Sequence, residues 1–394
     1  MTAPGTTPGP EGSARATAAL RALETVHAGL TAFAGWWPSD TTTDGRYRPR
    51  AAAAGQPIGS NTGWTTSFWS GQLWLAWQLT GDPRFRDAGL HQVADFAQRL
   101  EAAVDVDMHD LGFLYSLGCV LPWRLTGTEP GRAAGLAAAD HLMARVLPSA
   151  GIVQAWGDAS DPTQRGRTII DSLMNMPLLY WASEQTGDPR YAQAAHRHTG
   201  QLRDHIVRSD GTTFHTFHWD PVTGEPLHGT TQQGLADDSC WARGQAWGIY
   251  GFALAYRHTG DQTFLAASAR CADAFVDRLP EDHVPYWDLA FGTGSDQPRD
   301  SSAGAIAVGG LLELAASSGP GAAPEARRRA ADALLDALVQ DCAAPPGVAG
   351  GPLLAHGVYD MRSGTGVDEG NLWGDYFYLE ALTRQALPEW VSPW

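Results

Sequence analysis

Two aspartates are candidates for acid–base chemistry because each lies at the start of an otherwise apolar segment. Asp110 follows His109 in the stretch MHDLGF, and Asp171 lies in IIDSLMNMP. An aspartate at such a position is often only a helix cap. When two carboxylates meet in a dry pocket, however, burial and their mutual repulsion raise the pKa of one of them by more than a helix N-terminus lowers it. One of the pair could then be protonated near neutral pH and act as a general acid.

Aromatic and polar side chains gather in the same loops, which favours a carbohydrate pocket. A sugar ring has apolar C–H faces that stack on indole and a rim of hydroxyl groups that form hydrogen bonds. His215 and His218, both in FHTFHWD, are each more often structural than catalytic when taken alone. Four tryptophans could be either core residues or stacking platforms: Trp64, Trp156, Trp241 and Trp247.

Arg243, in the stretch CWARGQAW, has two interpretations. It could clamp a carboxylate of the substrate through paired N–H donors, or it could merely form an ion pair with Asp237 or Asp238. Gln233 in TTQQG has no evident packing role. The sequence therefore suggests that an acidic sugar could be held by a local positive charge.

Helical hairpins are the elements that must position these residues. The sequence TGDPRF at 80–85 recurs as TGDPRY at 186–191, and weaker copies follow near Gly127, Gly260 and Gly319. Glycine ends one helix in the left-handed conformation, aspartate caps the next, and proline fits its first turn. The segments before the connectors are apolar, and those after them alternate charged and apolar residues at helical spacing. We therefore expect an all-α fold in which five or six hairpins form a ring with an inner and an outer helical layer.

Composition limits the partners of the chain. Its 394 residues carry a net charge of -16, so no nucleic acid is expected, because phosphate binding needs a basic face. No apolar run is long enough for a bilayer or a signal peptide, which predicts no membrane association and a cytoplasmic location. Its 4 cysteines have no paired spacing, so free thiols and no metal or cofactor are expected. Residues 1–20 are predicted to be a disordered tail and 21–394 a single catalytic domain, with no indication of the oligomeric state.

Several of these stretches together resemble the unsaturated glucuronyl hydrolases of glycoside hydrolase family 88. The matching motifs include MHDLGF, IIDSLMNMPLLYWAS, FHTFHWDPVTGEP, DDSCWARGQAWGIYGF and GDYFYLEAL, and the resemblance runs from about Trp36 to Leu382. It implies an (α/α)6 barrel and an enzyme that removes the 4,5-unsaturated uronic acid left by polysaccharide lyases, with an unsaturated uronic-acid-containing oligosaccharide as its partner. The reaction in that family is hydration of the C4=C5 vinyl ether, rather than displacement at the anomeric carbon.

The same resemblance implies roles for individual residues. Asp171 would be the main acid and base, and Asp110 the second essential carboxylate. His215 is preferred to His218 because it takes the family's place before the DPVTGEP turn. Pro177 departs from the family pattern and predicts a kink in its helix. The residues expected around the substrate are Trp64, Phe68, His109, Trp156, His215, Gln233, Arg243 and Trp247.

Three alternatives remain open from the sequence. An unsaturated rhamnogalacturonyl hydrolase would share the fold and reaction but act on pectin fragments. A sugar epimerase on a similar ring should rely on paired histidine bases. A helical-repeat binding module would need no proton donor, so replacement of Asp171 by Asn would leave its function intact.

Overall fold

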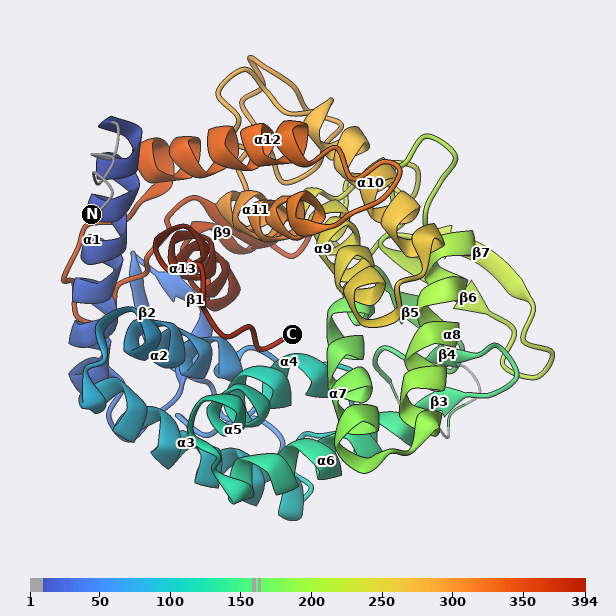
Figure 1. Ribbon diagram of the computed structural model, residues 1–394, viewed down its shortest axis with the longest axis horizontal. Helices are drawn as coiled ribbons and strands as arrows, with labels where there is room; N and C mark the ends of the chain where they lie inside the picture. Colours follow the sequence, from blue (N-terminus) through green and yellow to red (C-terminus); the bar gives the residue numbers. More distant parts are fainter. Residues whose placement is uncertain (1–9, 158–160, 162–163) are drawn as a thin grey trace, which may run out of the picture.

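The computed structural model describes residues 10–157, 161 and 164–394, and it shows two concentric rings of helices (Figure 1). The inner ring consists of α2 (Thr66–Thr80), α4 (Leu111–Tyr115) continued by the π-helical η1 (Ser116–Val120) and α5 (Leu121–Thr126), α7 (Met176–Thr186), α9 (Ala242–Thr259), α11 (Ser301–Ala316) and α13 (Leu372–Ala386). The outer ring consists of α1 (Pro10–Ala32), α3 (Pro83–Glu101), α6 (Glu129–Met143), α8 (Pro189–His205), α10 (Gln262–Val276) and α12 (Pro324–Ala337), which continues as η3 (Leu338–Cys342). The predicted (α/α)6 barrel is confirmed.

The repeated connectors adopt the predicted conformation. Gly81 ends α2 with φ 68°, and Gly187 ends α7 with φ 73°, both in the left-handed region. The side chain of Asp82 then accepts a hydrogen bond from the backbone N–H of Arg84 at 2.9 Å, as the N-cap of α3. Asp188 caps α8 in the same way. Each six-residue motif thus reverses the chain from an inner to an outer helix.

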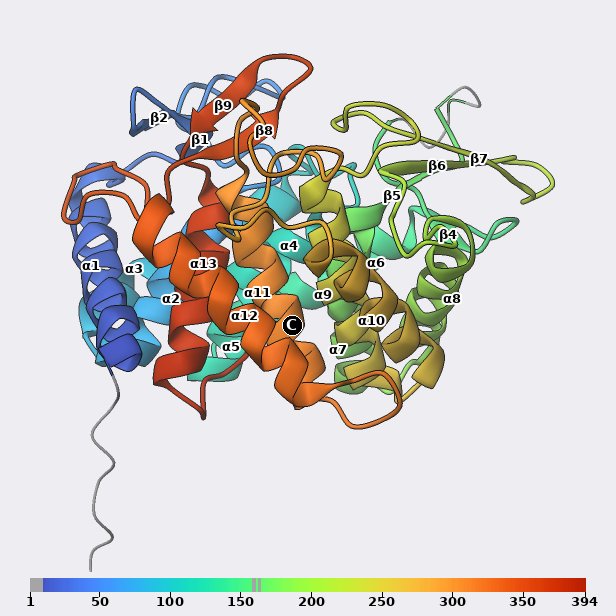
Figure 2. The same ribbon diagram turned by 90° about the horizontal axis from the view of Figure 1, so that it is seen from above.

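Short strands and loops gather at one end of the barrel (Figure 2). The largest sheet is antiparallel, with the order β5-β6-β7, and Thr168 on β5 pairs with Phe217 on β6. The β1–β2 hairpin contacts the β8–β9 hairpin, where the first and last hairpins of the ring meet. The strands are β1 (Pro38–Thr43), β2 (Arg46–Pro49), β3 (Val146–Leu147), β4 (Ile152–Val153), β5 (Arg167–Ile169), β6 (Thr216–Trp219), β7 (Pro226–Thr230), β8 (Gly357–Asp360) and β9 (Thr365–Glu369).

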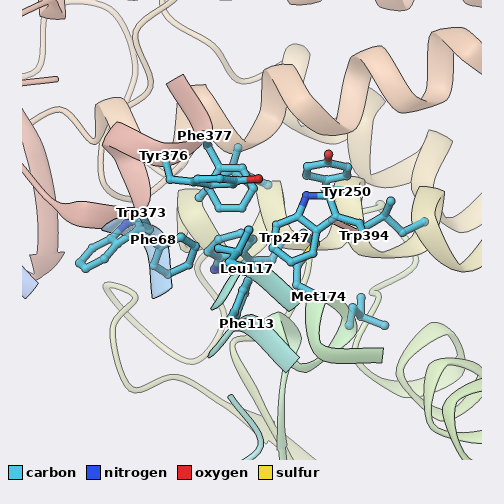
Figure 3. Packing of buried hydrophobic residues seen from close by; sticks show 14 of the residues in the cluster. Phe68, Phe113, Leu117, Met174, Trp247, Tyr250, Trp373, Tyr376, Phe377 and Trp394 are labelled. Atoms are coloured by element: carbon cyan, nitrogen blue, oxygen red, sulfur yellow. The ribbon is translucent and has the colours of Figure 1, made fainter. Parts of the chain in front are cut away.

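The centre of the inner ring is filled by aromatic side chains (Figure 3). The chain end lies inside the ring in Figure 1, where Trp394 stacks on Phe377 with ring centroids 6.0 Å apart. The indole N–H of Trp394 donates to the buried carboxylate of Glu380, which also accepts from the hydroxyl groups of Tyr250 and Tyr376. These three donors satisfy the buried carboxylate. Together with the aromatic rings around it, they make the centre of the inner ring a packed core.

The N-terminal helix corrects one prediction. Helix α1 begins at Pro10, so residues 10–20 are helical instead of forming part of a disordered tail, whereas residues 1–9 lie outside the described residues. The guanidinium of Arg15 explains the difference, because it pairs with Asp332 at 2.7 Å and with Asp336 at 2.6 Å on the outer helix α12. These contacts close the outer ring between its first and last helices.

Pro177 produces no kink within an α-helix. The 3-10 helix η2 (Ile170–Asn175) ends just before α7, and Pro177 occupies the first turn of α7, where a missing N–H breaks no helical bond. The 4 cysteines are free and buried, as expected. Among the described helices, none is long and apolar enough to cross a membrane.

Candidate functional site

The fold brings the two predicted acids to the same place from different hairpins. Asp110 is the N-cap residue of α4, and Asp171 lies in the first turn of η2. Nε2 of His109 is 3.3 Å from Oδ1 of Asp110 and 3.6 Å from Oδ1 of Asp171. The carboxylate of Asp110 makes no capping hydrogen bond, and Asp171 is not an N-cap residue, so the interpretation of both as simple helix caps is wrong.

Burial dominates the electrostatics of this cluster. The side chain of Asp171 is only 14% exposed, and desolvation raises its pKa to about 7. His109 and Arg243 oppose this shift, and the negative charge of Asp110 adds to it. Burial alone lowers the pKa of His109, but the charges of Asp110 and Asp171 together outweigh it and raise that pKa. Asp171 therefore has a pKa close to neutral pH, where it can both donate and accept a proton.

The two acids open onto a small pocket with a volume of about 270 Å³. Its wall combines indole rings with carboxylate, imidazole, amide and guanidinium groups, the mixture that stacks on a sugar ring and binds its hydroxyl rim. Trp64 and Trp156 are partly exposed, whereas Trp247 is only 1% exposed. The lining residues are Trp64, Asp110, Trp156, Ile169, Asp171, His215, Gln232, Gln233, Trp241, Arg243, Trp247, Tyr359 and Asp360.

His215 lines the pocket, and His218 is not among the lining residues. Nδ1 of His215 accepts a hydrogen bond from the backbone N–H of Gln232 at 2.8 Å. Burial lowers the pKa of His215 to about 3, so the ring is neutral and its proton is on Nε2. His218 lies three residues further along an extended segment and so faces the other way, with Nε2 3.0 Å from Oγ1 of Thr230.

Arg243 lies at the pocket but does not pair with Asp237 or Asp238. Its guanidinium forms a buried ion pair with Asp300 at 2.9 Å instead. It also donates to the backbone carbonyl of Tyr359 at 2.7 Å and rests on the ring of Trp241, with Cζ 4.4 Å from the ring centroid. The sequence alternatives missed Asp300, which lies 57 residues away along the chain.

Two of the expected substrate-binding residues lie behind the pocket wall. Phe68 is fully buried in the aromatic core (Figure 3) and is not among the lining residues. It packs edge-on against Trp64. His109 is 1% exposed and touches both acids. Phe68 supports an aromatic wall residue, and His109 supports the carboxylates. The remaining predicted residues all line the pocket.

Tyr359 is a wall residue that sequence reasoning missed. It lies on β8 in the stretch HGVYD, which is not part of any of the predicted motifs. Its hydroxyl accepts a hydrogen bond from Nε1 of Trp64 at 3.0 Å, and its backbone carbonyl accepts from the side-chain amide of Gln233 at 3.2 Å. An aromatic residue next to Asp360 at a strand end was the available signal.

The cluster of His109, Asp110 and Asp171 also brings three potential ligand atoms within 4.8 Å of one another. The negative charges of Asp110 and Asp171 raise the pKa of His109 and so favour its protonated form, in which a ring nitrogen offers no lone pair to a metal. We therefore assign none of the three residues as a metal ligand.

Comparison with known proteins gives a consistent result. The profile of Glycosyl Hydrolase Family 88 matches residues 36–312. The chain is 45% identical over 329 residues to an unsaturated chondroitin disaccharide hydrolase of Streptococcus pneumoniae, covering 83% of each sequence. It also resembles the crystal structure of unsaturated glucuronyl hydrolase from Streptococcus agalactiae, at 41% identity and a TM-score of 0.92 over 97% of this chain and 94% of that one. A mutant of that enzyme complexed with dGlcA-GalNAc6S matches at 39% identity and a TM-score of 0.84, over 96% and 93%. The chain belongs to glycosyl hydrolase family 88.

Proposed function

We propose that this protein removes the 4,5-unsaturated uronic acid from the non-reducing end of lyase-generated oligosaccharides, by hydrating the C4=C5 double bond. The observation that carries the proposal is the pair of carboxylates in an indole-lined pocket, with the pKa of Asp171 raised to about 7 by burial. A group with this pKa can give up a proton and take one back in a single catalytic cycle at neutral pH.

The proposed reaction needs one acid and one water molecule. Protonated Asp171 donates its proton to C4, and the positive charge that develops is shared between C5 and the ring oxygen. Water then adds to C5 and returns a proton to the Asp171 carboxylate, which restores the starting state. The resulting hemiketal opens to a ketone at C5 and leaves a hemiacetal at C1, which breaks down to release the remaining sugar.

The proposed role of the neighbouring residues follows from their charge. Asp110 is the second carboxylate facing the reacting atoms, and Nε2 of His109 lies within 3.6 Å of both acids, where a protonated imidazole would stabilise their negative charge. A substrate carboxylate would approach the neutral Nε2–H donor of His215 and the positive field of Arg243. Because Arg243 already donates to Asp300, Tyr359 and Val358, its contribution is a fixed local charge as much as a direct clamp.

The relatives support the glycosaminoglycan class of substrate over pectin fragments. The matching curated proteins are named for unsaturated chondroitin disaccharides or for an unsaturated glucuronyl group. A structure described as specific for heparin is more distant, at 29% identity. We therefore propose an unsaturated chondroitin-type disaccharide as the substrate. The cytoplasmic location and the single-domain organisation of residues 21–394 stay predictions.

The test is the variant Asp171→Asn, assayed by the loss of ultraviolet absorbance of unsaturated disaccharides from chondroitin, hyaluronan, heparin and pectin. The variant should fold and bind the substrate, yet lose turnover by a factor on the order of 100 to 10,000, as expected for loss of a general acid. Normal turnover in the variant would refute the role of Asp171. Preference of the parent protein for the pectin fragment would refute the proposed substrate class.

A further inference from the structure

Helix α4 is capped by a residue from a different hairpin. An aspartate at the N-cap normally accepts a hydrogen bond from the second or third N–H of its own helix. Asp110 occupies this position but makes no such bond. Instead, the side-chain oxygen of Asn175 accepts a hydrogen bond from the N–H of Phe113, the third residue of the helix, at 2.8 Å. The N–H of Phe113 thus has its partner on another hairpin, and the Asp110 carboxylate does not accept a hydrogen bond from it.

Close contact between the two acid-bearing segments makes this arrangement possible. Asn175 ends η2 four residues after Asp171 and is fully buried. A Cβ atom on Gly112 would lie 2.2 Å from Cα of Asn175, so no larger residue fits at Gly112 without a backbone shift. The absence of a side chain at Gly112 therefore lets Asn175 reach the first turn of α4.

We propose that Asn175 is a positioning residue, which caps α4 in place of Asp110 and thereby keeps the Asp110 carboxylate turned toward Asp171 and His109. The inference rests on the proposed roles of Asp110 and Asp171 in the reaction. Without Asn175, the buried N–H of Phe113 would have no hydrogen-bond acceptor, and an unsatisfied buried donor lowers the stability of the folded protein. The Asp110 carboxylate would then rotate back to cap its own helix and leave the cluster.

Such a rotation has a measurable effect on Asp171. The charged or titratable groups around Asp171 are His109 and Asp110 from the loop before α4, Arg243 from α9, and His215, whose backbone carbonyl accepts from the N–H of Ile170 next to Asp171. Tyr359 and Asp360 also line the pocket. Of all these groups, Asp110 carries the negative charge that raises the pKa of Asp171. Its withdrawal should lower this pKa, so that Asp171 loses its proton at a lower pH.

The test compares Asn175→Ala with the matched variant Asn371→Ala. Asn371 is also buried and caps the third N–H of an inner helix, that of Gly374 in α13, at 2.7 Å, but it does not line the pocket. Both variants should lower the melting temperature, since each loses a cap. Only Asn175→Ala should reduce kcat, by roughly tenfold to a hundredfold, and move the alkaline limb of the pH–rate profile down by about one pH unit.

An unchanged kcat and pH profile in Asn175→Ala, with the same loss of melting temperature as in Asn371→Ala, would overturn the proposal. If Asn175→Ala does not fold, Asn175→Asp decides the question, because it keeps an acceptor for Phe113 and adds a negative charge near Asp171. This variant should fold, turn over substrate and show an alkaline limb shifted to higher pH. A shift to lower pH, no shift, or failure to fold would contradict the capping role. Full activity of Asp171→Asn would instead refute the proposed function itself, so the two failures are distinguishable.

Discussion

Replacement of Asp171 by Asn should stabilise the protein at alkaline pH while lowering turnover by orders of magnitude. The pKa of this carboxyl rises from 3.8 in the unfolded chain to about 7 in the folded protein, mainly because of burial. Folding is therefore favoured by the protonated form: this stability is fully present below pH 3.8 and is lost as the pH rises through 7. At about 1.4 kcal/mol for each pKa unit, the shift corresponds to a cost of up to about 4 kcal/mol for holding the ionised group above pH 7.

Asn has nearly the shape of a protonated aspartic acid but cannot ionise, so it removes this cost. The assay is denaturant unfolding of the parent and the Asp171→Asn variant between pH 5 and pH 8. The difference in the free energy of unfolding should be about 2 kcal/mol at pH 5, where the unfolded chain is already ionised, and should grow toward about 4 kcal/mol at pH 8. A difference that stays constant with pH would show that Asp171 titrates normally in the folded protein, and the assigned acid–base role would lose its physical basis.

Two further predictions concern the pocket wall. Arg243→Ala should weaken substrate binding and also destabilise the fold by about 3–5 kcal/mol, because it leaves the carboxylate of Asp300 buried without its partner; substrate affinity equal to that of the parent would exclude Arg243 from the binding site. His215→Ala should raise KM, whereas His218→Ala, which removes a side chain outside the pocket, should leave kcat and KM unchanged; equal kinetic effects of the two substitutions would contradict this placement.

Local sequence signals predicted the repeating helical hairpin because the interactions that end one helix and begin the next lie within a few residues. In TGDPRF, the left-handed glycine, the capping aspartate and the first-turn proline act on adjacent backbone groups, and Gly81 and Asp82 do so in the structure. Helix α1 shows the limit of such reasoning. Its sequence from Pro10 resembles a flexible tail, but Arg15 pairs with two aspartates more than 300 residues away, which no local pattern reveals.

The candidate site was predicted in its residue types but not in its contacts. The sequence indicated Asp110 and Asp171 as acids, and the family resemblance favoured His215 over His218. The structure places Asp110, Asp171 and His215 at the pocket. The sequence did not indicate that Phe68 lies behind the wall. Tyr359 was missed as well, because its position in the wall depends on how the inner helices pack and the aromatic residue beside Asp360 was only a weak signal.

By itself, the sequence determined where helices end and begin at the repeated connectors, which segments face the interior, and which residue types could transfer a proton or stack on a sugar. Ring closure decided the rest. It brought Asp171 to Asp110, paired Arg243 with Asp300, and let Asn175 reach the start of α4. The physical reason is range: caps and turns act between neighbours in the chain, whereas burial and charge depend on groups that only the closed barrel brings together.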